Sequence, residues 1–557
     1  MPHAVSIATP GLQALILCGP GSSFPTFTAN PDENPKALLP IANRPMVWYP
    51  LEFCYRAGIT NITLVCPPSA AEAISTALKT NPFLTSLPFP RPDLLAPKDL
   101  DQNTGTAEIL RLPELQDVVT SDFLVLPCDL VCELGADKLL QAWMVKSASL
   151  EDLVGDSRSR GLRSGGLGVW YQTKTATPIK GEETDFIATV PLPSSAVLPA
   201  KGSLFSHMAK VVYSMPTDSL KDLLEDKKGF PIRHGLLRQH PRVRMLTTHR
   251  DAHIYIFPHW VMQFVKENER LETIGEDVVG WWAKASWQKG LSTKLGLNKI
   301  LRRAGGDHDD GHVSPGGNNP QTRKLGVDSR ATDAPTTVVS IKNGNGDDSH
   351  SDHSDNPSPE NDPDSEPPVP PMLAYIHPST PDTPLIRRAD TAQLLLQISL
   401  QLAKLPSIEE VGPEAASPFA HARKVAYPEG VKPRTTITKA DSLVADNVTV
   451  QEKTSIKECV VGANCQIGEG AKLSQCLLMD GVVVGKNCKL TRCILGRRAE
   501  VGEGCVLTEC EVQENLLVEA KTEAKEEKFM SSSGLEATEQ DLDAFEDSDG
   551  NDEAVED

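Results

Sequence analysis

A glycine-rich loop near the start of the chain has the residue types of a phosphate site. Residues 12–18 form a short, continuously apolar run that is typical of a central parallel strand. Gly19 and Gly21 follow at once, within Gly-Pro-Gly-Ser-Ser. Because glycine has no side chain, such a loop could admit a phosphate close to its backbone N–H groups. The loop is therefore the first candidate binding site.

The charges around this loop argue against catalysis. Phosphoryl and nucleotidyl transfer depend on cations that stabilise the charge spreading over phosphate oxygens. No Lys or Arg precedes Lys36 in the sequence. Because loss of a catalytic cation slows such a reaction by about a thousand-fold or more, we expect no useful nucleotidyl transfer.

Seven of the twelve cysteines form a second group of side chains that could do chemistry. They are Cys459, Cys465, Cys476, Cys488, Cys493, Cys505 and Cys510, and each lies two residues before an aliphatic residue. A metal site or a set of disulfides is one interpretation, but no Cys-x-x-Cys pair occurs among them. The regular spacing instead favours a packed column of buried, reduced thiols, which implies a reducing compartment.

The elements that would position the loop alternate between helices and strands. After the first strand, the sequence predicts a helix from Trp48 to Ala57 and a strand at residues 62–65. A further helix opens at Gly105, and a strand at residues 123–126 leads to Asp129. This order predicts a doubly wound α/β sheet with ligands at the carboxyl ends of its strands.

The region from Val444 to Val518 carries inward aliphatic residues on a strict spacing of six, six and five. They are Val444, Val450, Ile456, Val461, Ile467, Leu473, Leu478, Val484, Leu490, Leu495, Val501, Leu507, Val512 and Val518. This period predicts a three-sided coil stacked on itself, a left-handed parallel β-helix of between four and five coils. Several of these aliphatics are followed by glycine, which we expect at corners that need unusual dihedral angles. They are Gly462, Gly468, Gly485, Gly496 and Gly502.

These patterns predict five segments. An α/β domain spans residues 1–304, and a Ser-, Asp- and Pro-rich insertion at 305–371 is expected to be disordered. Residues 372–440 form a connecting segment whose helix opens at Asp390 and ends near Lys404. The β-helix spans 441–520. An acidic tail, expected to be disordered, spans 521–557 and holds eleven acidic and no basic residues from 536 onward.

Charge and hydropathy argue against a nucleic-acid-binding, membrane-spanning or secreted protein. The formal net charge of −20 argues against a nucleic-acid surface. No apolar run reaches membrane-spanning length. The first 35 residues lack Lys and Arg, so the cationic start of a secretory or mitochondrial signal is missing. We therefore expect a cytosolic protein without direct nucleic-acid or membrane partners.

The order of the N-terminal motifs resembles that of the nucleotide-sugar pyrophosphorylases, many of which also carry a C-terminal β-helix. The matching features are the Gly19–Ser23 loop, the stretch beginning Pro35-Lys36, the Gly105-Thr106-Ala107 segment and Asp129. The resemblance implies a nucleotide site, with Asp129 at the position of a Mg²⁺ ligand. The loop is one residue short, however, and Ser23 stands where the family has a catalytic Arg. His253 stands where the family has a glycine at the sugar pocket.

These departures indicate a vestigial nucleotide or phosphate site made of Gly19, Gly21, Lys36, Gly105 and Asp129. We predict no catalytic residue, no bound metal and no cofactor there. Asp129 is more readily explained as a relic or a strand-end cap than as a working metal ligand.

Within this superfamily the chain resembles the non-catalytic gamma subunits of translation initiation factor 2B. The motifs are Asp251-Ala252-His253-Ile254-Tyr255, the segment from Glu276 to Trp282, and Arg388-Ala389-Asp390-Thr391. The related epsilon subunits continue past their β-helix into a helical exchange domain, which we do not expect here. The resemblance implies a structural and regulatory subunit of the guanine-nucleotide exchange complex. Its partners would be the epsilon and other subunits of initiation factor 2B, and initiation factor 2.

Two other functions are compatible with parts of the sequence. A sugar-nucleotide pyrophosphorylase, such as a GDP-mannose pyrophosphorylase or its regulatory subunit, is the main alternative. A β-helix acyltransferase is the third hypothesis. Such an enzyme needs a histidine base near the coils, and because no histidine follows His421 the sequence comes close to excluding it.

Three tryptophans lie within seven residues, in a segment that looks helical. Trp281, Trp282 and Trp287 could pack that helix on the sheet or anchor a subunit interface. The sequence leaves both interpretations open, and we take the three as candidate interface residues.

Overall fold

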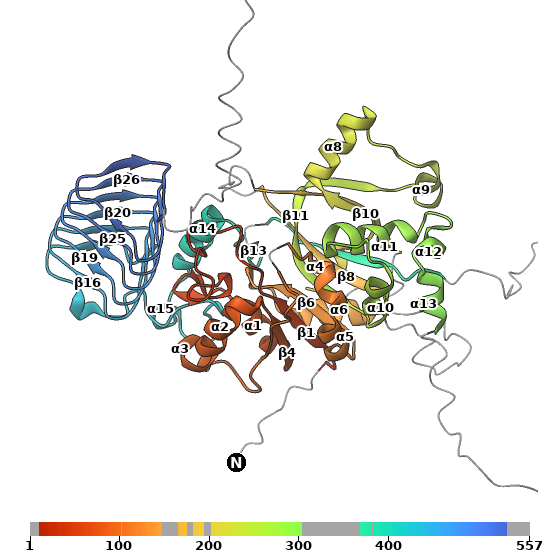
Figure 1. The fold of residues 1–557 in the computed structure, drawn as a ribbon, viewed down its shortest axis with the longest axis horizontal. Helices are drawn as coiled ribbons and strands as arrows, with labels where there is room; N and C mark the ends of the chain where they lie inside the picture. Colours follow the sequence, from red (N-terminus) through yellow and green to blue (C-terminus); the bar gives the residue numbers. More distant parts are fainter. Residues whose placement is uncertain are drawn as a thin grey trace, which may run out of the picture.

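The computed structural model describes residues 10–101, 103–147, 165–174, 182–193, 202–303, 368–380 and 383–531. An α/β domain and a β-helix lie side by side, with helix α14 between them (Figure 1). The predicted insertion lies outside the described residues except for 368–371, as does the acidic sequence after residue 531. Among the described helices, none is long and apolar enough to cross a membrane.

A nine-stranded mixed sheet forms the centre of the α/β domain. Its order is β5-β4-β1-β6-β11-β8-β12-β10-β9. The strands are β1 (Gln13–Leu17), β4 (Asn61–Val65), β5 (Asp93–Leu95), β6 (Phe123–Pro127), β8 (Gly166–Gln172), β9 (Asp185–Pro191), β10 (Met208–Pro216), β11 (Arg244–Phe257) and β12 (Met372–Ile376). The strands β5, β4, β1 and β6 run parallel, and β11 pairs antiparallel with β6. The three strands predicted at residues 12–18, 62–65 and 123–126 are confirmed, and they lie next to one another in one sheet as β1, β4 and β6.

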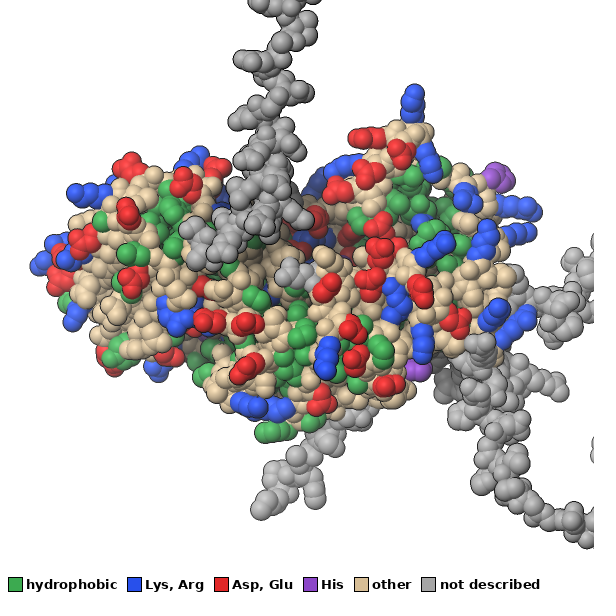
Figure 2. Space-filling view, viewed as in Figure 1, with side chains coloured by type: hydrophobic (Ala, Val, Ile, Leu, Met, Phe, Trp, Pro, Cys, Tyr) green, Lys and Arg blue, Asp and Glu red, His purple; other side chains and the backbone are tan. Residues whose placement is uncertain are grey.

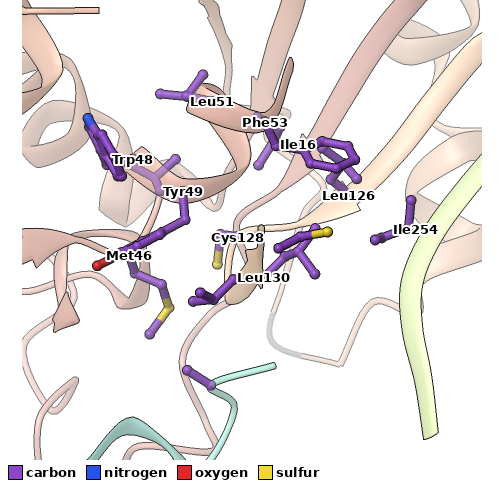
Figure 3. Packing of buried hydrophobic residues seen from close by; sticks show 14 of the residues in the cluster. Ile16, Met46, Trp48, Tyr49, Leu51, Phe53, Leu126, Cys128, Leu130 and Ile254 are labelled. Carbon is purple, nitrogen blue, oxygen red and sulfur yellow. The ribbon is translucent and has the colours of Figure 1, made fainter. Parts of the chain in front are cut away.

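Helices cover both faces of this sheet. One face carries α1 (Trp48–Arg56), α2 (Pro68–Thr80), α3 (Pro82–Thr85) and α6 (Ala136–Ser147). The other carries α4 (Thr106–Arg111), α5 (Pro113–Val118), α10 (Trp260–Glu267), α11 (Val279–Ala285), α12 (Leu291–Lys294) and α13 (Leu297–Arg303). Alternate strand residues feed the two cores: Ile16 packs with Phe53 and Leu126 in the first, and Leu15 belongs to the second (Figure 3). A small outer cluster joins β9 and β10 to α8 (Thr217–Lys227) and α9 (His234–Gln239).

The sheet takes one strand from beyond the predicted insertion. Strand β12 lies between β8 and β10 and pairs parallel with β8. The backbone carbonyl of Pro370 also accepts a hydrogen bond from the buried indole of Trp282, at 2.8 Å. The α/β domain therefore includes residues 368–376, past the boundary predicted at 304.

A connecting segment then leads toward the β-helix. Strand β13 (Ile386–Arg388) pairs antiparallel with β7 (Leu130–Cys132), which follows β6. Helix α14 (Ala392–Ala403) begins at Thr391, whose hydroxyl accepts a hydrogen bond from the backbone N–H of Leu394. Its buried face includes Leu394, Leu395, Ile398 and Leu402, and the helix lies within the predicted range from Asp390 to Lys404. A short helix, α15 (Ile408–Val411), precedes the first coil.

Three parallel sheets, one per side, form the β-helix. They contain the strands β14-β17-β20-β23-β26-β29, β15-β18-β21-β24-β27-β30 and β16-β19-β22-β25-β28. Their bounds are β14 (Thr436–Ile437), β15 (Leu443–Val444), β16 (Thr449–Val450), β17 (Ser455–Lys457), β18 (Val460–Val461), β19 (Gln466–Ile467), β20 (Lys472–Ser474), β21 (Leu477–Leu478), β22 (Val483–Val484), β23 (Lys489–Thr491), β24 (Ile494–Leu495), β25 (Glu500–Val501), β26 (Val506–Thr508), β27 (Glu511–Val512), β28 (Leu517–Val518), β29 (Glu523–Lys525) and β30 (Lys528–Phe529). The predicted register is confirmed, because Val444 pairs with Val461 and Val461 with Leu478.

The coil extends beyond the predicted range at both ends. At the start, Ile437 pairs with Ile456 and isolated bridges join Val425 to Val444, so this turn is longer than the later ones. At the other end, Ala524 and Phe529 take the inward positions, so part of the predicted tail belongs to the coil. An irregular first turn and a small inward alanine hid these positions from the aliphatic pattern.

The glycines that follow the aliphatic residues have a different role from the one predicted. None of the five has a positive φ angle. A Cβ on Gly485 would lie 2.7 Å from the backbone of Gly502, and one on Gly502 would lie 2.5 Å from the backbone N of Ala520. Close stacking of coils therefore requires these glycines. The left-handed corner conformation belongs to other residues, such as Asn464 and Asn487.

The prediction of buried, reduced cysteines is confirmed. The seven coil cysteines are free and at most 1% exposed. Their thiols lie near backbone carbonyls; the Cys488 thiol, for example, is 3.0 Å from the carbonyl oxygen of Gly502. Burial raises the pKa of the Cys465 thiol to about 12, so this group stays protonated.

Candidate functional site

Asp129 is the buried centre of the candidate site. It follows β6 at the carboxyl end of the parallel strands, and the residue is 0% exposed. Lys36, the first residue of the 3-10 helix Lys36–Leu38, places its Nζ 2.7 Å from Asp129 Oδ2. Arg388, at the end of β13, places its Nε 3.1 Å from Asp129 Oδ1. The structure thus brings together two of the predicted residues and one that the prediction did not include.

These charges stabilise one another. Burial alone would raise the pKa of Asp129, but Arg388 and Lys36 outweigh it and hold the pKa below its usual range. Burial would lower the pKa of Lys36, but Asp129 more than offsets this and raises it. The same carboxylate raises the pKa of Arg388 against the effect of burial. All three groups are therefore charged at neutral pH.

A second ion pair continues the network. Asp390 lies 2.5 Å from Nη2 of Arg250 and 3.6 Å from Nη2 of Arg388. Arg250 is 4% exposed and also lies 3.4 Å from Glu183. Strand β11 supplies Arg250, and the short stretch between β13 and α14 supplies Asp390, so the network joins distant parts of the chain.

The segment 251–255 on β11 fills the region where the resemblance implies a sugar pocket. His253 has a φ angle of +51°, and burial lowers the pKa of its imidazole well below the usual value. Its backbone N–H donates to Asp251 Oδ1 at 2.8 Å, and the Tyr255 hydroxyl donates to Asp251 Oδ2. Burial, reinforced by Asp185, raises the pKa of Asp251 to about 7. The cluster is self-contained and neutral at mildly acidic pH.

The glycine-rich loop folds back on itself. Gly21 has a φ angle of +92°, and its carbonyl accepts hydrogen bonds from the Thr28 hydroxyl and the Phe24 N–H, both at 2.8 Å. The Phe24 side chain is 1% exposed and lies 5.9 Å below Lys36 Nζ. Gly19 has no heavy atom within 4 Å of an added Cβ. The Gly19 end of the loop therefore keeps space beside its backbone, whereas Gly21 does not.

Carboxylates of the β-helix contact the stretch that follows this loop. The Thr26 hydroxyl donates to Oε2 of Glu511 at 2.8 Å. The amides of Asn30 and Asn34 both donate to Glu514, which is 6% exposed. The side-chain donors of this stretch are therefore already paired with acidic side chains of the same chain.

Gly105 lies apart from the ion pairs. It precedes α4, and an added Cβ would lie 2.2 Å from the backbone oxygen of Glu272. The Glu108 side chain accepts a hydrogen bond from its N–H. Close packing against the segment before α11 explains this glycine.

The three tryptophans divide by burial. Trp282 is 0% and Trp287 6% exposed, and their indole N–H groups donate to backbone carbonyls of Pro370 and Val212. Core packing, one of the two interpretations, describes these two residues. Trp281 is 39% exposed, with Lys284 Nζ 4.7 Å from its ring centre, and it remains the candidate interface residue.

A divalent metal does not fit at Asp129. Both carboxylate oxygens already contact cationic nitrogens, and two positive charges would repel the metal. Among the described residues, no group of three His, Cys, Asp or Glu side chains could hold a metal ion.

Sequence reasoning missed the roles of Arg388, Asp390 and Arg250 at this site. The first two were noted only as part of a motif before a helix. One signal in the sequence could have indicated these roles. Arg388 and Asp390 are two residues apart on an extended segment, so their side chains point to the same side.

Two family descriptions match the chain. Residues 30–160 match a nucleotidyl transferase family, and residues 429–524 match the family described as EIF2B subunit epsilon LbH domain. The chain therefore has an N-terminal nucleotidyltransferase domain and a C-terminal left-handed β-helix, as the sequence predicted.

Curated relatives extend the comparison. The chain is 27% identical over 303 residues to translation initiation factor eIF2B subunit gamma of Schizosaccharomyces pombe, covering 54% of this chain and 58% of that protein. It is 21% identical over 269 residues to the Caenorhabditis elegans subunit gamma, covering 48% and 57%. A 109-residue match to the Schizosaccharomyces pombe subunit epsilon is 27% identical and covers 20% and 16%. The chain thus spans a little over half the length of these gamma relatives, which agree with the resemblance seen in the motifs.

Proposed function

We propose that this chain is a non-catalytic structural and regulatory subunit of the initiation factor 2B guanine-nucleotide exchange complex. Its partners would be the epsilon and other subunits of that factor, and initiation factor 2. The observation that carries the proposal is the state of the glycine-rich loop and of the stretch after it. The loop supplies no cation, and the donors Thr26, Asn30 and Asn34 that follow it bind Glu511 and Glu514. The choice of this complex rests on the similar proteins, which are named as gamma and epsilon subunits of eIF2B.

The chemistry of nucleotidyl transfer supports the non-catalytic part. The reaction needs cations aimed at the phosphates. Lys36 and Arg388 are committed to Asp129, and Ser23 contributes no charge.

The surface and the thiols support a cytosolic protein that binds other proteins. Acidic and basic side chains are interspersed on the face in Figure 2, without the continuous basic stripe expected of a nucleic-acid surface. Free, buried cysteines are stable in a reducing compartment. The exposed Trp281, stacked beside Lys284, supplies an aromatic anchor for a partner subunit.

The test is to tag the chain in its own cells, weigh the native complex by mass spectrometry and measure GDP release from initiation factor 2. We expect a larger chain of the same architecture to co-purify, and exchange to require the complex. Trp281→Ala should lower the yield of partner subunits, whereas Phe89→Ala, at another exposed aromatic residue, should not. A homo-oligomer with pyrophosphate-dependent turnover of a nucleotide sugar would overturn the proposal.

A further inference from the structure

Backbone pairing fixes Arg388 against Asp129. Strand β13 aligns Arg388 with Leu130 and Ile386 with Cys132. The next residue, Ala389, donates its N–H to the backbone carbonyl of Asp129 at 2.9 Å. The guanidinium is therefore delivered by a paired strand, and this is a more precise placement than a mobile surface side chain would give.

The guanidinium and Lys36 together satisfy the whole carboxylate. Arg388 contacts Oδ1 through Nε at 3.1 Å and Oδ2 through Nη2 at 3.4 Å. Lys36 contacts Oδ2 at 2.7 Å. The side chains of Asp129, Lys36 and Arg388 are 1%, 12% and 13% exposed. Two-point contact with a permanently charged guanidinium suits a carboxylate that must stay ionised inside the protein.

We propose that Arg388 is a built-in cation that takes the place of a divalent metal at Asp129. This substitution turns the carboxylate at the end of β6 into an anchor for the segment that leads to the β-helix. Asp390 adds a second attachment point, because it pairs with Arg250 of β11. Helix α14 begins two residues later and packs against the coils, so the anchor lies at the root of the connection between the domains.

The proposal goes beyond a role in an exchange complex, because it concerns how this chain holds its own segments together. It gives Asp129 a structural role in a domain whose loop lacks catalytic cations. It also assigns Lys36 a structural role, that of second counter-charge for the same carboxylate.

The first test is metal binding, with Mn²⁺ as the probe and its electron paramagnetic resonance signal as the readout. The wild-type chain and Asp129→Asn should leave the same amount of free Mn²⁺ across a titration. Tight Mn²⁺ binding by the wild-type chain that Asp129→Asn removes would overturn the proposal. This comparison needs no variant of Arg388.

The second test is hydrogen exchange of the backbone amides in residues 386–403. Arg388→Ala should speed their exchange by about tenfold or more, because the buried carboxylate loses its partner. Arg387→Ala is the matched control: its guanidinium contacts the backbone oxygen of Gln172 and the Tyr171 ring, away from Asp129. If Arg388→Ala does not fold, Arg388→Lys replaces it in the experiment. Because lysine keeps the charge but loses the two-point contact, its amide exchange should be faster than that of the wild type and slower than that expected for the alanine variant. Equal exchange in the Arg387 and Arg388 variants would contradict the anchor.

Discussion

At the scale of single residues, two buried aspartates show how neighbours decide the charge of the same side chain. Asp129 faces two cations, so its carboxylate stays ionised. Burial and the neighbouring Asp185 raise the pKa of Asp251 to about 7, although the hydrogen bond from the Tyr255 hydroxyl works against this rise. The burial of the two groups is similar, so the contrast comes from the charges that surround them. One carboxylate stabilises the fold when ionised, and the other when protonated.

Replacing Asp251 should change how stability depends on pH. An acid whose folded pKa is raised holds a proton that the unfolded chain releases above about pH 4. Its contribution is complete below that pH and is lost as the pH rises through about 7. The free energy of unfolding should therefore fall across this range, by up to about 1.4 kcal/mol per pH unit. Asp251→Asn should remove this slope.

Chemical denaturation at several pH values between about 5.5 and 8 measures this slope. The exposed Asp117→Asn serves as control and should follow the wild-type curve. An Asp251→Asn variant that keeps the wild-type slope would show that Asp251 is ionised throughout.

At the scale of elements, two different backbone requirements meet at five corners of the coil, those that begin at Gly462, Gly468, Gly485, Gly496 and Gly502. One position adopts a left-handed conformation, and it is filled by Asn, Gly or a charged residue. Another, just after the inward aliphatic residue, stacks against the backbone of the next coil and leaves no room for a Cβ. Glycine occurs at both positions for unrelated reasons, and only the structure separates them.

Two glycines in one coil test this distinction. Gly502→Ala should destabilise the protein by about 1–3 kcal/mol, because the Cβ would meet the Ala520 backbone. Gly504→Asn should change stability by less than about 0.5 kcal/mol. Its φ angle of +73° suits asparagine, which already holds this conformation at Asn464 and Asn487. Denaturant unfolding of both variants gives the comparison, and similar losses in the two would refute it.

The sequence predicted the elements whose signal is local or periodic. The β-helix register follows from side chains that repeat every 17 residues, so one turn predicts the next. Helix α14 was equally readable, because a capping threonine and an apolar face lie within one short segment. The longer first turn broke this period, and the prediction started one turn late.

Pairings between segments that are far apart in the chain could not be predicted from the sequence. Strand β12 pairs with β8, which lies about 200 residues earlier in the sequence. Its apolar residues suit a buried strand, but they do not indicate which strand it pairs with. At the site, motif order identified Lys36 and Asp129, but Arg388 lies 259 residues after Asp129 and reaches it only through the β7–β13 pair. The loop contacts with Glu511 and Glu514 have the same origin, since they depend on how one domain docks on the other.

At the scale of the whole molecule, the two domains share one continuous core. Outward residues of one coil face, Leu443, Val460, Leu477 and Ile494, belong to the same buried cluster as α1 and α14. Hydrogen bonds also join the two domains: the side-chain amide of Asn43 donates to the backbone oxygen of Val461 at 3.0 Å. Figure 1 shows the coil axis beside the α/β domain with α14 in the gap. This arrangement favours a fixed angle between the domains.

Glu514 tests how far the loop contacts contribute to that angle. It accepts hydrogen bonds from Asn30 and Asn34 in a nearly buried position. Glu514→Ala removes both acceptors, which should cost about 1–3 kcal/mol locally. Hydrogen exchange in residues 26–34 should then accelerate by about tenfold, while the shared apolar core keeps the domains docked.

The matched control is Glu500→Ala, which removes an exposed carboxylate from β25 on a different side of the coil. It should leave the exchange of residues 26–34 unchanged. If both variants behave alike, the loop is held by Phe24 and Phe27 in the core, and the coil only covers it. If Glu514→Ala alone frees the loop, the β-helix carboxylates are what keep it closed. Small-angle scattering of Glu514→Ala then tests the arrangement of the two domains. An unchanged profile shows that the shared core sets the interdomain angle. An expanded profile shows that the Glu514 contact sets it.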